Sequence, residues 1–365
     1  MTGGGDAPGA ARAPAAGIRR PRTCIWEITG ACDLRCLHCG NRSGTRHPRE
    51  LGWDELCEVA ASLARLGCRT VELTGGEPLL RPDWERLSRR CADLGLQVAL
   101  VTNGLGLDDE TLERALAAGV GHVAISLDGP REVHDALRVR ARPGPSPFDG
   151  AVAALRRASA RLPTTAITAV TRGNLPLLPE LHRLLAELGV PRWQVQLAVP
   201  TGRVREAPEP LAIRPADLEG LERLLAGWIE EGSPPHVMVS DSIGYGTELE
   251  PALRRRPTGQ GMWLGCLAGI RSVAITYDGR VRGCSFLPEA FDAGDLHDES
   301  LEAIWSDPER FGVRQRLAEP RLEGGCADCP EGRVCRAGCA SMAWWTTGSL
   351  YDNPYCLRRV RKEPA

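Results

Sequence analysis

The chain has 365 residues, of which 42% are apolar and 25% charged, and its formal charge is −2 at pH 7. These values are typical of one large globular domain, or of a main domain with a smaller one, and they favour neither a nucleic acid nor an anionic membrane as a partner. Fourteen cysteines without a secretion signal favour metal or redox chemistry in a reducing, cytoplasmic setting over disulfide bonds.

In chain order, residues 1–23 are rich in Ala, Gly, Pro and Arg and lack an apolar segment, which predicts a disordered tail rather than a signal peptide. Lys362, the only lysine, lies at the other end of the chain. An enzyme that forms a Schiff base on a core lysine, or a P-loop nucleotide-binding enzyme, is therefore not expected.

Between residues 24 and 232, short apolar runs alternate with amphipathic helical patterns. The predicted strands are 24–29, 70–73, 97–101, 122–127, 164–170 and 193–199. The predicted helices are 56–66, 83–94, 108–118, 149–161, 176–188 and 215–231. Repeated strand-then-helix units with short connections predict an α/β fold, a partial (β/α)6 barrel of the TIM type. In such a barrel the chemistry collects at the C-terminal ends of the strands.

The pattern changes after residue 232. Residues 233–265 carry Pro, Gly and charged clusters, which predicts a bridging segment. Residues 266–356 are rich in cysteine and loops, so we expect a small domain that has little apolar core and depends on metal for its fold. Residues 357–365 read as a tail.

Three cysteines follow the first predicted strand: Cys32, Cys36 and Cys39, in a C-x3-C-x2-C pattern. Three thiolates on one short loop can hold three corners of a cubane iron–sulfur cluster and leave one iron free. A structural zinc site would need a fourth protein ligand. His38 is poorly placed to be that ligand because it adjoins Cys39 in the same loop. Three unligated core cysteines are the remaining alternative.

This loop after the first barrel strand resembles the signature of the radical SAM superfamily. The resemblance implies a [4Fe-4S] cluster whose free iron binds the amino and carboxylate groups of S-adenosylmethionine (SAM). One-electron reduction then yields a 5'-deoxyadenosyl radical, which abstracts a hydrogen atom from the substrate. His38 departs from the pattern, since the family usually has an aromatic residue before the last cysteine.

Further residues match the family at the ends of the second, third and fourth strands. The resemblance implies that the GGEP turn receives the SAM amino group, and that a serine and an arginine contact the ribose and the carboxylate. The SAM contacts expected on this basis are Gly75, Gly76, Glu77, Pro78, Asn103, Ser126 and Arg138. For Arg138 the alternative is a solvated surface arginine, and for Asn103 a simple turn at the end of a strand.

The C-terminal cysteines resemble the SPASM extension of radical SAM enzymes, which holds two auxiliary [4Fe-4S] clusters. They are Cys266, Cys284, Cys326, Cys329, Cys335, Cys339 and Cys356. The alternative is zinc, which also uses C-x2-C pairs. By resemblance, the second auxiliary cluster is held by Cys326, Cys329, Cys335 and Cys356. That leaves Cys266, Cys284 and Cys339 for the first. The whole chain would then carry three [4Fe-4S] clusters together with SAM.

The number of cysteines supports one further hypothesis. Two closed cubane clusters need eight cysteines, and this region has seven. The first auxiliary cluster is therefore expected to have an iron that is open to substrate or capped by another residue. Mössbauer spectra with four protein ligands on both auxiliary clusters would contradict this hypothesis.

Several other residues receive weaker predictions. Cys24, Cys57, Cys68 and Cys91 are expected to pack as small apolar side chains. Asp128, Gln194, Gln196 and Arg203 are placed at the barrel mouth by their positions at strand ends. The pattern assigns no catalytic residue among them.

The family resemblance favours an oxidoreductase that modifies a ribosomally synthesised peptide by a thioether or carbon–carbon crosslink. One alternative is a dehydrogenase or epimerase of a sugar or aminocyclitol, and a narrower one is maturation of a sulfatase. A third, of another class, is a non-catalytic iron–sulfur electron carrier. A reductase such as flavodoxin or ferredoxin is the expected partner. Because only a short segment precedes the first strand, a separate protein is expected to bind any leader peptide.

Overall fold

The computed structural model describes residues 20–240, 242–254, 263, 265–318 and 321–362. Most of the expected N-terminal tail, residues 1–19, lies outside the described ranges, and Thr23 already begins the first strand.

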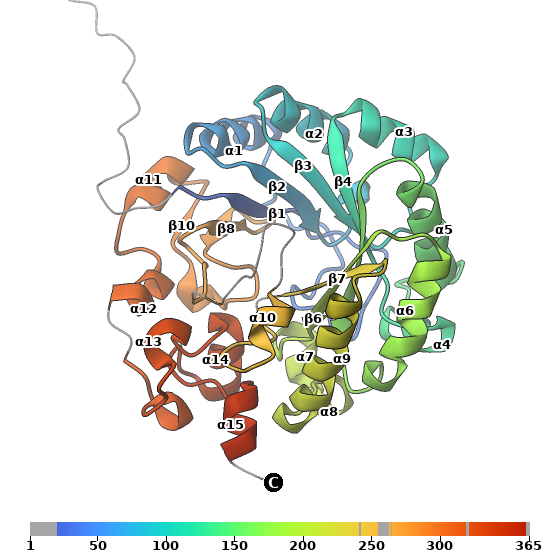
Figure 1. The fold of residues 1–365 in the computed structure, drawn as a ribbon. Coiled ribbons are helices and arrows are strands. Elements are labelled where there is room, and N and C mark those ends of the chain that lie inside the picture. Colours follow the sequence, from blue (N-terminus) through green and yellow to red (C-terminus); the bar gives the residue numbers. More distant parts are fainter. Residues whose placement is uncertain (1–19, 241, 255–262, 264, 319–320, 363–365) are drawn as a thin grey trace, which may run out of the picture.

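Seven parallel strands follow one another in a curved sheet, with most of the helices between them on its outer side (Figure 1). The strands are β1 (Thr23–Thr29), β2 (Thr70–Gly75), β3 (Gln97–Thr102), β4 (Val120–Ser126), β5 (Thr164–Val170), β6 (Arg192–Leu197) and β7 (His236–Val239). The helices are α1 (Trp53–Arg65), α2 (Trp84–Asp93), α3 (Asp109–Ala117), α4 (Arg131–Leu137), α5 (Pro147–Ser159), α6 (Leu178–Glu187), α7 (Gly202–Glu206), α8 (Pro208–Leu211) and α9 (Leu218–Glu231). The predicted partial barrel is confirmed.

The alternation of side chains along β1 explains why the barrel interior is polar. Trp26 and Ile28 join the apolar core beneath the outer helices, so Glu27, between them, points to the opposite face. The same alternation in β6 turns Gln194 and Gln196 inward, because Trp193 and its apolar neighbours belong to that core. These two strands therefore present apolar side chains to the helices and polar ones to the barrel interior.

Beyond residue 232 the chain has more regular structure than its sequence predicts. Within the expected bridging segment, β7 pairs with β6. At the opposite edge of the sheet, β8 (Ser272–Ile275) pairs in parallel with β1. The strands β9 (Arg280–Arg282) and β10 (Gly294–Asp295) then extend the sheet by antiparallel pairing. Val273 and Ile275 are fully buried in the same core as the barrel. This part of the C-terminal region therefore shares the apolar core of the barrel instead of forming one of its own.

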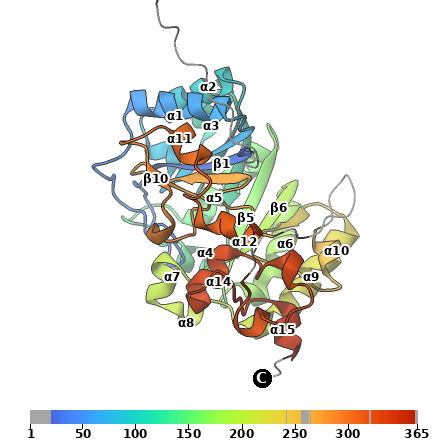
Figure 2. The same cartoon turned by 90° about the vertical axis from the view of Figure 1, so that its left-hand side faces the viewer.

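The remaining helices are short, and most of them lie between the two ends of the sheet, while the one over Leu301–Ser306 packs beside α1 (Figures 1 and 2). They are α10 (Glu250–Leu253), α11 (Leu301–Ser306), α12 (Gln315–Ala318), α13 (Gly332–Cys335), α14 (Ala340–Thr347) and α15 (Leu357–Lys362). The last of these takes the place of the expected C-terminal tail. In the part of the chain that the structure describes, no helix is both long and apolar enough to cross a membrane.

Candidate active site

The three N-terminal cysteines lie on the loop that follows β1, at the barrel mouth. The amide of Leu34 donates to Cys32 Sγ (3.4 Å), and the amide of Cys39 donates to Cys36 O (3.2 Å). Burial raises the pKa of Cys32 to about 12 and that of Cys36 to about 11, so a bound iron would have to displace both thiol protons. No group of three His, Cys, Asp or Glu side chains among the described residues is arranged to hold a single metal ion. A cubane differs from such a site, because each thiolate binds a separate iron.

The GGEP turn packs directly against the start of this loop. A Cβ on Gly75 would lie 2.4 Å from Thr29 O, and one on Gly76 would lie 2.1 Å from Ala31 O. The amide of Gly76 donates to Thr29 O (2.7 Å), and that of Glu77 donates to Ala31 O (2.7 Å). Only glycine permits this approach of two backbones. Pro78 then begins a single 3-10 turn, Pro78–Leu80.

Glu77 and Asn103 join three strand ends. Buried Glu77 accepts hydrogen bonds from Thr102 Oγ1 (2.7 Å) and from the amide of Asn103 (2.8 Å). Burial raises the pKa of Glu77 to about 7, against the effect of these hydrogen bonds. Asn103 Nδ2 in turn donates to Asp33 Oδ1 (2.7 Å) in the cysteine loop. Both residues, expected as SAM contacts, thus also hold the loop against β2 and β3.

Arg138 reaches the cysteine loop from the segment after α4. Its Nε donates to Asp128 Oδ2 (2.5 Å), and its Nη1 lies 4.0 Å from Cys36 Sγ. His38 Nε2 lies 3.1 Å from the same carboxylate. Burial alone would raise the pKa of Asp128, but Arg138 and His38 outweigh it and hold that pKa well below its ordinary value. Arg138 is therefore not a solvated surface residue, and His38 has a structural partner. Half-buried Ser126 ends β4 at the same mouth.

The four residues that the sequence placed at the barrel mouth divide into two pairs. Asp128 and Arg203 contact the cysteine loop: Arg203 donates to Cys36 O (3.2 Å) and to Ser43 O (2.8 Å). Gln194 and Gln196 line the interior, 3.5 Å apart.

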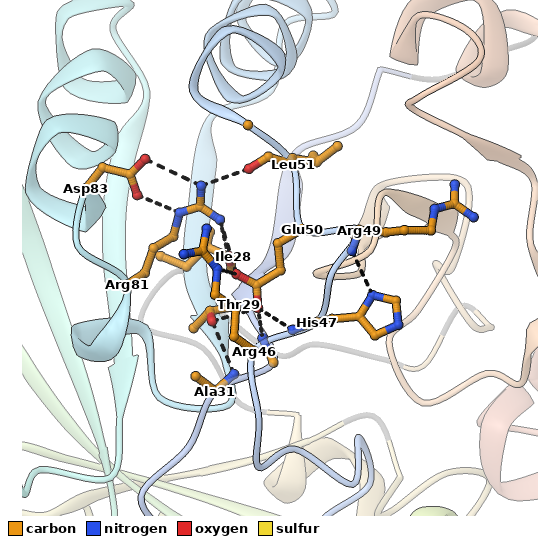
Figure 3. Close-up of polar contacts among 12 residues, drawn as sticks. Ile28, Thr29, Ala31, Arg46, His47, Arg49, Glu50, Leu51, Arg81 and Asp83 are labelled. Carbon is orange, nitrogen blue, oxygen red and sulfur yellow. Dashed lines mark hydrogen bonds and ion pairs between the residues drawn. The ribbon is translucent and has the colours of Figure 1, made fainter.

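Sequence reasoning missed a buried network beneath the loop (Figure 3). Glu50 accepts hydrogen bonds from Thr29 Oγ1 (2.9 Å) and from two backbone amides, those of Gly30 (2.8 Å) and His47 (3.1 Å). Arg81 donates to two buried carbonyls, Ile28 O (2.6 Å) and Leu51 O (2.8 Å), and pairs with Asp83 (2.6 Å). The network ties both ends of the segment that carries the cysteines to the barrel. These partners are distant in sequence, and neither residue belongs to a recognisable motif.

We expect Arg81→Met to lower the free energy of unfolding by about 3–5 kcal/mol, measured by urea denaturation. Glu50, itself 2% exposed, lies 3.8 Å from Arg81 and would lose its buried cation, while two carbonyls would lose their donor. Arg89→Met, an exposed arginine on α2, is the matched control, with an expected change within about 0.5 kcal/mol. Equal effects of the two substitutions would contradict this account.

The C-terminal cysteines form two groups. The pKa of Cys335 is raised to about 12, mainly by burial and also by the thiols of Cys356, Cys326 and Cys329. These four side chains are therefore neighbours, as expected for the second auxiliary cluster. Cys266 and Cys284 pack against a separate small apolar cluster. The seventh, Cys339, belongs to neither group: it directly precedes α14 and packs against the main apolar core, and its Sγ lies 3.2 Å from Ser341 Oγ.

A cavity of about 490 Å³ separates the first cysteine loop from the segment that follows Cys284. Its polar and charged lining includes Glu27, Asn41, Arg42, Arg205, Asp278 and Arg282, and its aromatic lining is Tyr277 and Trp345. Glu27 is only 3% exposed. Burial raises the pKa of Glu27 to about 8, while Arg282 and Asn41 lower it and Asp278 adds to the rise. The cavity thus contains a carboxyl group that is mostly protonated at neutral pH.

The pH dependence of stability tests this assignment of Glu27. The folded-state pKa, near 8, exceeds the ordinary value of 4.5, so the stabilising contribution is complete below pH 4.5 and is lost as pH rises through 8. We expect Glu27→Gln to remove a slope of about 1.4 kcal/mol per pH unit across this window, measured by urea denaturation. Glu289→Gln, at an exposed position in the same cavity, is expected to leave the slope unchanged. Parallel pH profiles for the wild type and Glu27→Gln would refute the raised pKa.

Comparisons with known proteins identify the family. Residues 26–176 match the radical SAM superfamily, and residues 266–330 match the iron–sulfur cluster-binding SPASM domain. The AdoMet-dependent heme synthase of Methanosarcina barkeri is 33% identical over 94% of this chain and 98% of its own length. The chain belongs to the radical SAM superfamily. It is therefore an enzyme, with a SPASM region after its barrel.

Other radical SAM proteins are also similar to this chain. The mycofactocin maturase MftC of Mycolicibacterium smegmatis is 32% identical over 93% of this chain and 82% of its own. Among solved structures, anSMEcpe with bound AdoMet has a TM-score of 0.72 at 18% identity and covers 94% of this chain and 96% of its own. Streptococcus suis SuiB bound to precursor peptide SuiA has a TM-score of 0.69 at 18% identity, with coverages of 92% and 75%. These structures share the fold.

Membership of the family confirms the cofactor class. The two matched regions imply a [4Fe-4S] cluster for the barrel and auxiliary clusters for the C-terminal region. The match to SPASM ends at residue 330, before Cys335, Cys339 and Cys356, although the structure places Cys335 and Cys356 with the cysteines inside the matched range.

Proposed function

We propose that Cys32, Cys36 and Cys39 hold the cluster that binds SAM. Three thiols on one loop, with no further ligand nearby in sequence, suit a cubane that keeps one iron for a cofactor. When bound, this cluster and SAM supply a 5'-deoxyadenosyl radical that can take a hydrogen atom from an unactivated C–H bond. The seven distal cysteines are proposed to hold two auxiliary clusters, and the hypothesis of an open iron in the first is retained.

Residues of this chain fix the loop and shape the SAM site. Arg203 binds the carbonyls of Cys36 and Ser43, and Arg138 is held beside Cys36 by the carboxylate of Asp128. Because both cations are near the loop, they favour thiolates over thiols there. Gly75 and Gly76 let the GGEP turn pack against the start of the cysteine loop, and Ser126 lies at the same mouth. Gly75, Gly76, Glu77, Pro78, Asn103, Ser126 and Arg138 therefore remain the proposed surroundings of SAM.

We propose that the substrate is a peptide, which the enzyme oxidises at a C–H bond. The cavity between the two cysteine regions supports this proposal because its walls are mostly polar and charged, which suits a backbone rich in hydrogen-bonding groups. MftC is named as a maturase, and SuiB was solved with a precursor peptide. The cavity also adjoins Cys39 through Gly40 and Cys284 through Ser285, so hydrogen removal and electron return would occur on either side of one bound substrate.

A second candidate substrate is a haem-precursor porphyrin. The similar protein of Methanosarcina barkeri is named as a heme synthase. The arginines of the cavity would suit the carboxylate side chains of such a porphyrin. A flat macrocycle, however, needs broad apolar walls, and the described lining offers few of them.

Deuterium transfer into 5'-deoxyadenosine distinguishes these proposals. The reduced, reconstituted enzyme would be incubated with SAM and with one of three perdeuterated probes: a peptide encoded beside its gene, a haem-precursor porphyrin, or an aminocyclitol. Transfer from the peptide alone is the expected result. Transfer from only the porphyrin or only the aminocyclitol would replace the peptide proposal.

A flavodoxin or ferredoxin reductase completes the proposal, since it would supply the electron for SAM cleavage.

A further inference from the structure

A left-handed turn lies between two of the C-terminal cysteines. Arg336, Ala337 and Gly338 have φ values of 53°, 59° and 62°, and they connect Cys335 to Cys339. For residues with a Cβ, this conformation costs about 1–2 kcal/mol each. The turn therefore persists only where its surroundings hold it firmly.

Side-chain donors hold four consecutive carbonyl groups of this segment. Trp263 Nε1 donates to Cys335 O (3.1 Å), and Asn353 Nδ2 donates to Ala337 O (3.2 Å). A single nitrogen of Arg316, Nη2, donates to the two remaining carbonyls, Arg336 O and Gly338 O (the latter at 3.2 Å). Arg316 thus bridges the two ends of the left-handed turn from α12.

The rest of the Arg316 guanidinium has no acceptor among the residues that the structure describes. The residue is 2% exposed, and within that part of the chain its Nε and Nη1 are buried without a hydrogen-bond partner. Among the described residues, no carboxylate forms an ion pair with it. A buried guanidinium is always charged, and burying it with unmade hydrogen bonds is costly. The arrangement therefore suits an anionic acceptor that protein side chains alone do not provide.

The cysteines at either end of the turn would supply that acceptor once they bind a cluster. Iron–sulfur clusters bring thiolate and sulfide sulfurs, which accept hydrogen bonds and carry negative charge. Cys335 belongs to the group proposed for the second auxiliary cluster, and Cys339 to that proposed for the first. Arg316 is the buried cation that binds the segment joining them.

We propose that Arg316 is a positioning residue of the auxiliary clusters, which fixes the turn between Cys335 and Cys339 and raises the reduction potential of at least one of them. Positive charge and donated hydrogen bonds stabilise the more negative, reduced state of a cluster. A higher potential makes the cluster a better acceptor of an electron from a substrate radical. This inference rests on the presence of auxiliary clusters, which the family implies, and is independent of the substrate.

The test is an EPR-monitored redox titration of the full-length, reconstituted protein. We expect Arg316→Met to shift the midpoint potential of an auxiliary cluster to a lower value, while the radical SAM cluster in the same sample stays unchanged. The matched control is Arg333→Met, which removes an exposed charge two residues before Cys335 and is expected to leave all potentials as in the wild type because water screens it.

Iron content keeps the test decisive. If Arg316→Met does not retain its auxiliary iron, the titration is made on Arg316→Lys instead. This variant keeps the positive charge but loses the planar guanidinium, so we expect a smaller decrease of the midpoint potential. Unchanged auxiliary potentials in a variant with full iron content would overturn the proposal. So would an equal shift in Arg333→Met, because that would show a general effect of charge.

Discussion

Replacing Cys36 by alanine is expected to reduce SAM cleavage to the level of a sample without enzyme. The proposed cubane would keep two protein thiolates, and Arg138, whose Nη1 lies 4.0 Å from Cys36 Sγ, would lose that sulfur, while the hydrogen bond from Arg203 to Cys36 O would remain. A cluster in which two of the four irons lack a protein ligand is lost or converts to another cluster type. The enzyme would then have no cluster to pass an electron to SAM. The measurement is 5'-deoxyadenosine formed from SAM under dithionite, by liquid chromatography.

Cys57→Ala is the matched control for this experiment. Cys57 is half-buried on α1, outside the loop, and the sequence predicts that it packs as a small apolar group. SAM cleavage by this variant should equal that of the wild type. Normal cleavage by Cys36→Ala, with Cys57→Ala also normal, would remove the basis for the proposed cluster.

Replacing Cys335 by alanine is expected to abolish product while SAM cleavage continues. Cys335 is grouped with Cys326, Cys329 and Cys356, far from the first cysteine loop in sequence. Loss of this corner would remove the acceptor for the electron of the substrate radical but leave the SAM cluster intact. We expect 5'-deoxyadenosine to form without the matching amount of modified peptide, both measured by mass spectrometry.

Val334→Ala, at the exposed neighbouring position, is the control and should leave the ratio of product to 5'-deoxyadenosine unchanged. Product formation by Cys335→Ala at the wild-type ratio would show that the second auxiliary cluster is dispensable. Loss of both SAM cleavage and product would instead indicate that the two regions fold together and that the substitution disrupts both.

The sequence predicted the barrel well because the signals there are local. Apolar residues recur at helical spacing in α1, and alternation in β1 separates Trp26 and Ile28 from Glu27. The spacing of Cys32, Cys36 and Cys39 is equally local, so these residues could be singled out before any fold was known.

What the sequence did not reveal depends on contacts between distant segments. Arg81 meets carbonyls 53 and 30 residues earlier in the chain. His38 reaches Asp128 across the barrel mouth, and Arg316 binds a turn some 20 residues later. No periodicity or spacing encodes such pairs. The strands β8 and β9, only four and three residues long, are also too short to stand out from the loops around them.

The parallel pairing of β1 with β8 has a consequence for how the protein is made. Cys24 lies opposite Val273, so β1 waits during synthesis for a partner about 250 residues later. Until that partner arrives, one edge of β1 presents unpaired amide and carbonyl groups, which are open to pairing with another chain. This edge of the barrel is therefore protected only after most of the chain has been made.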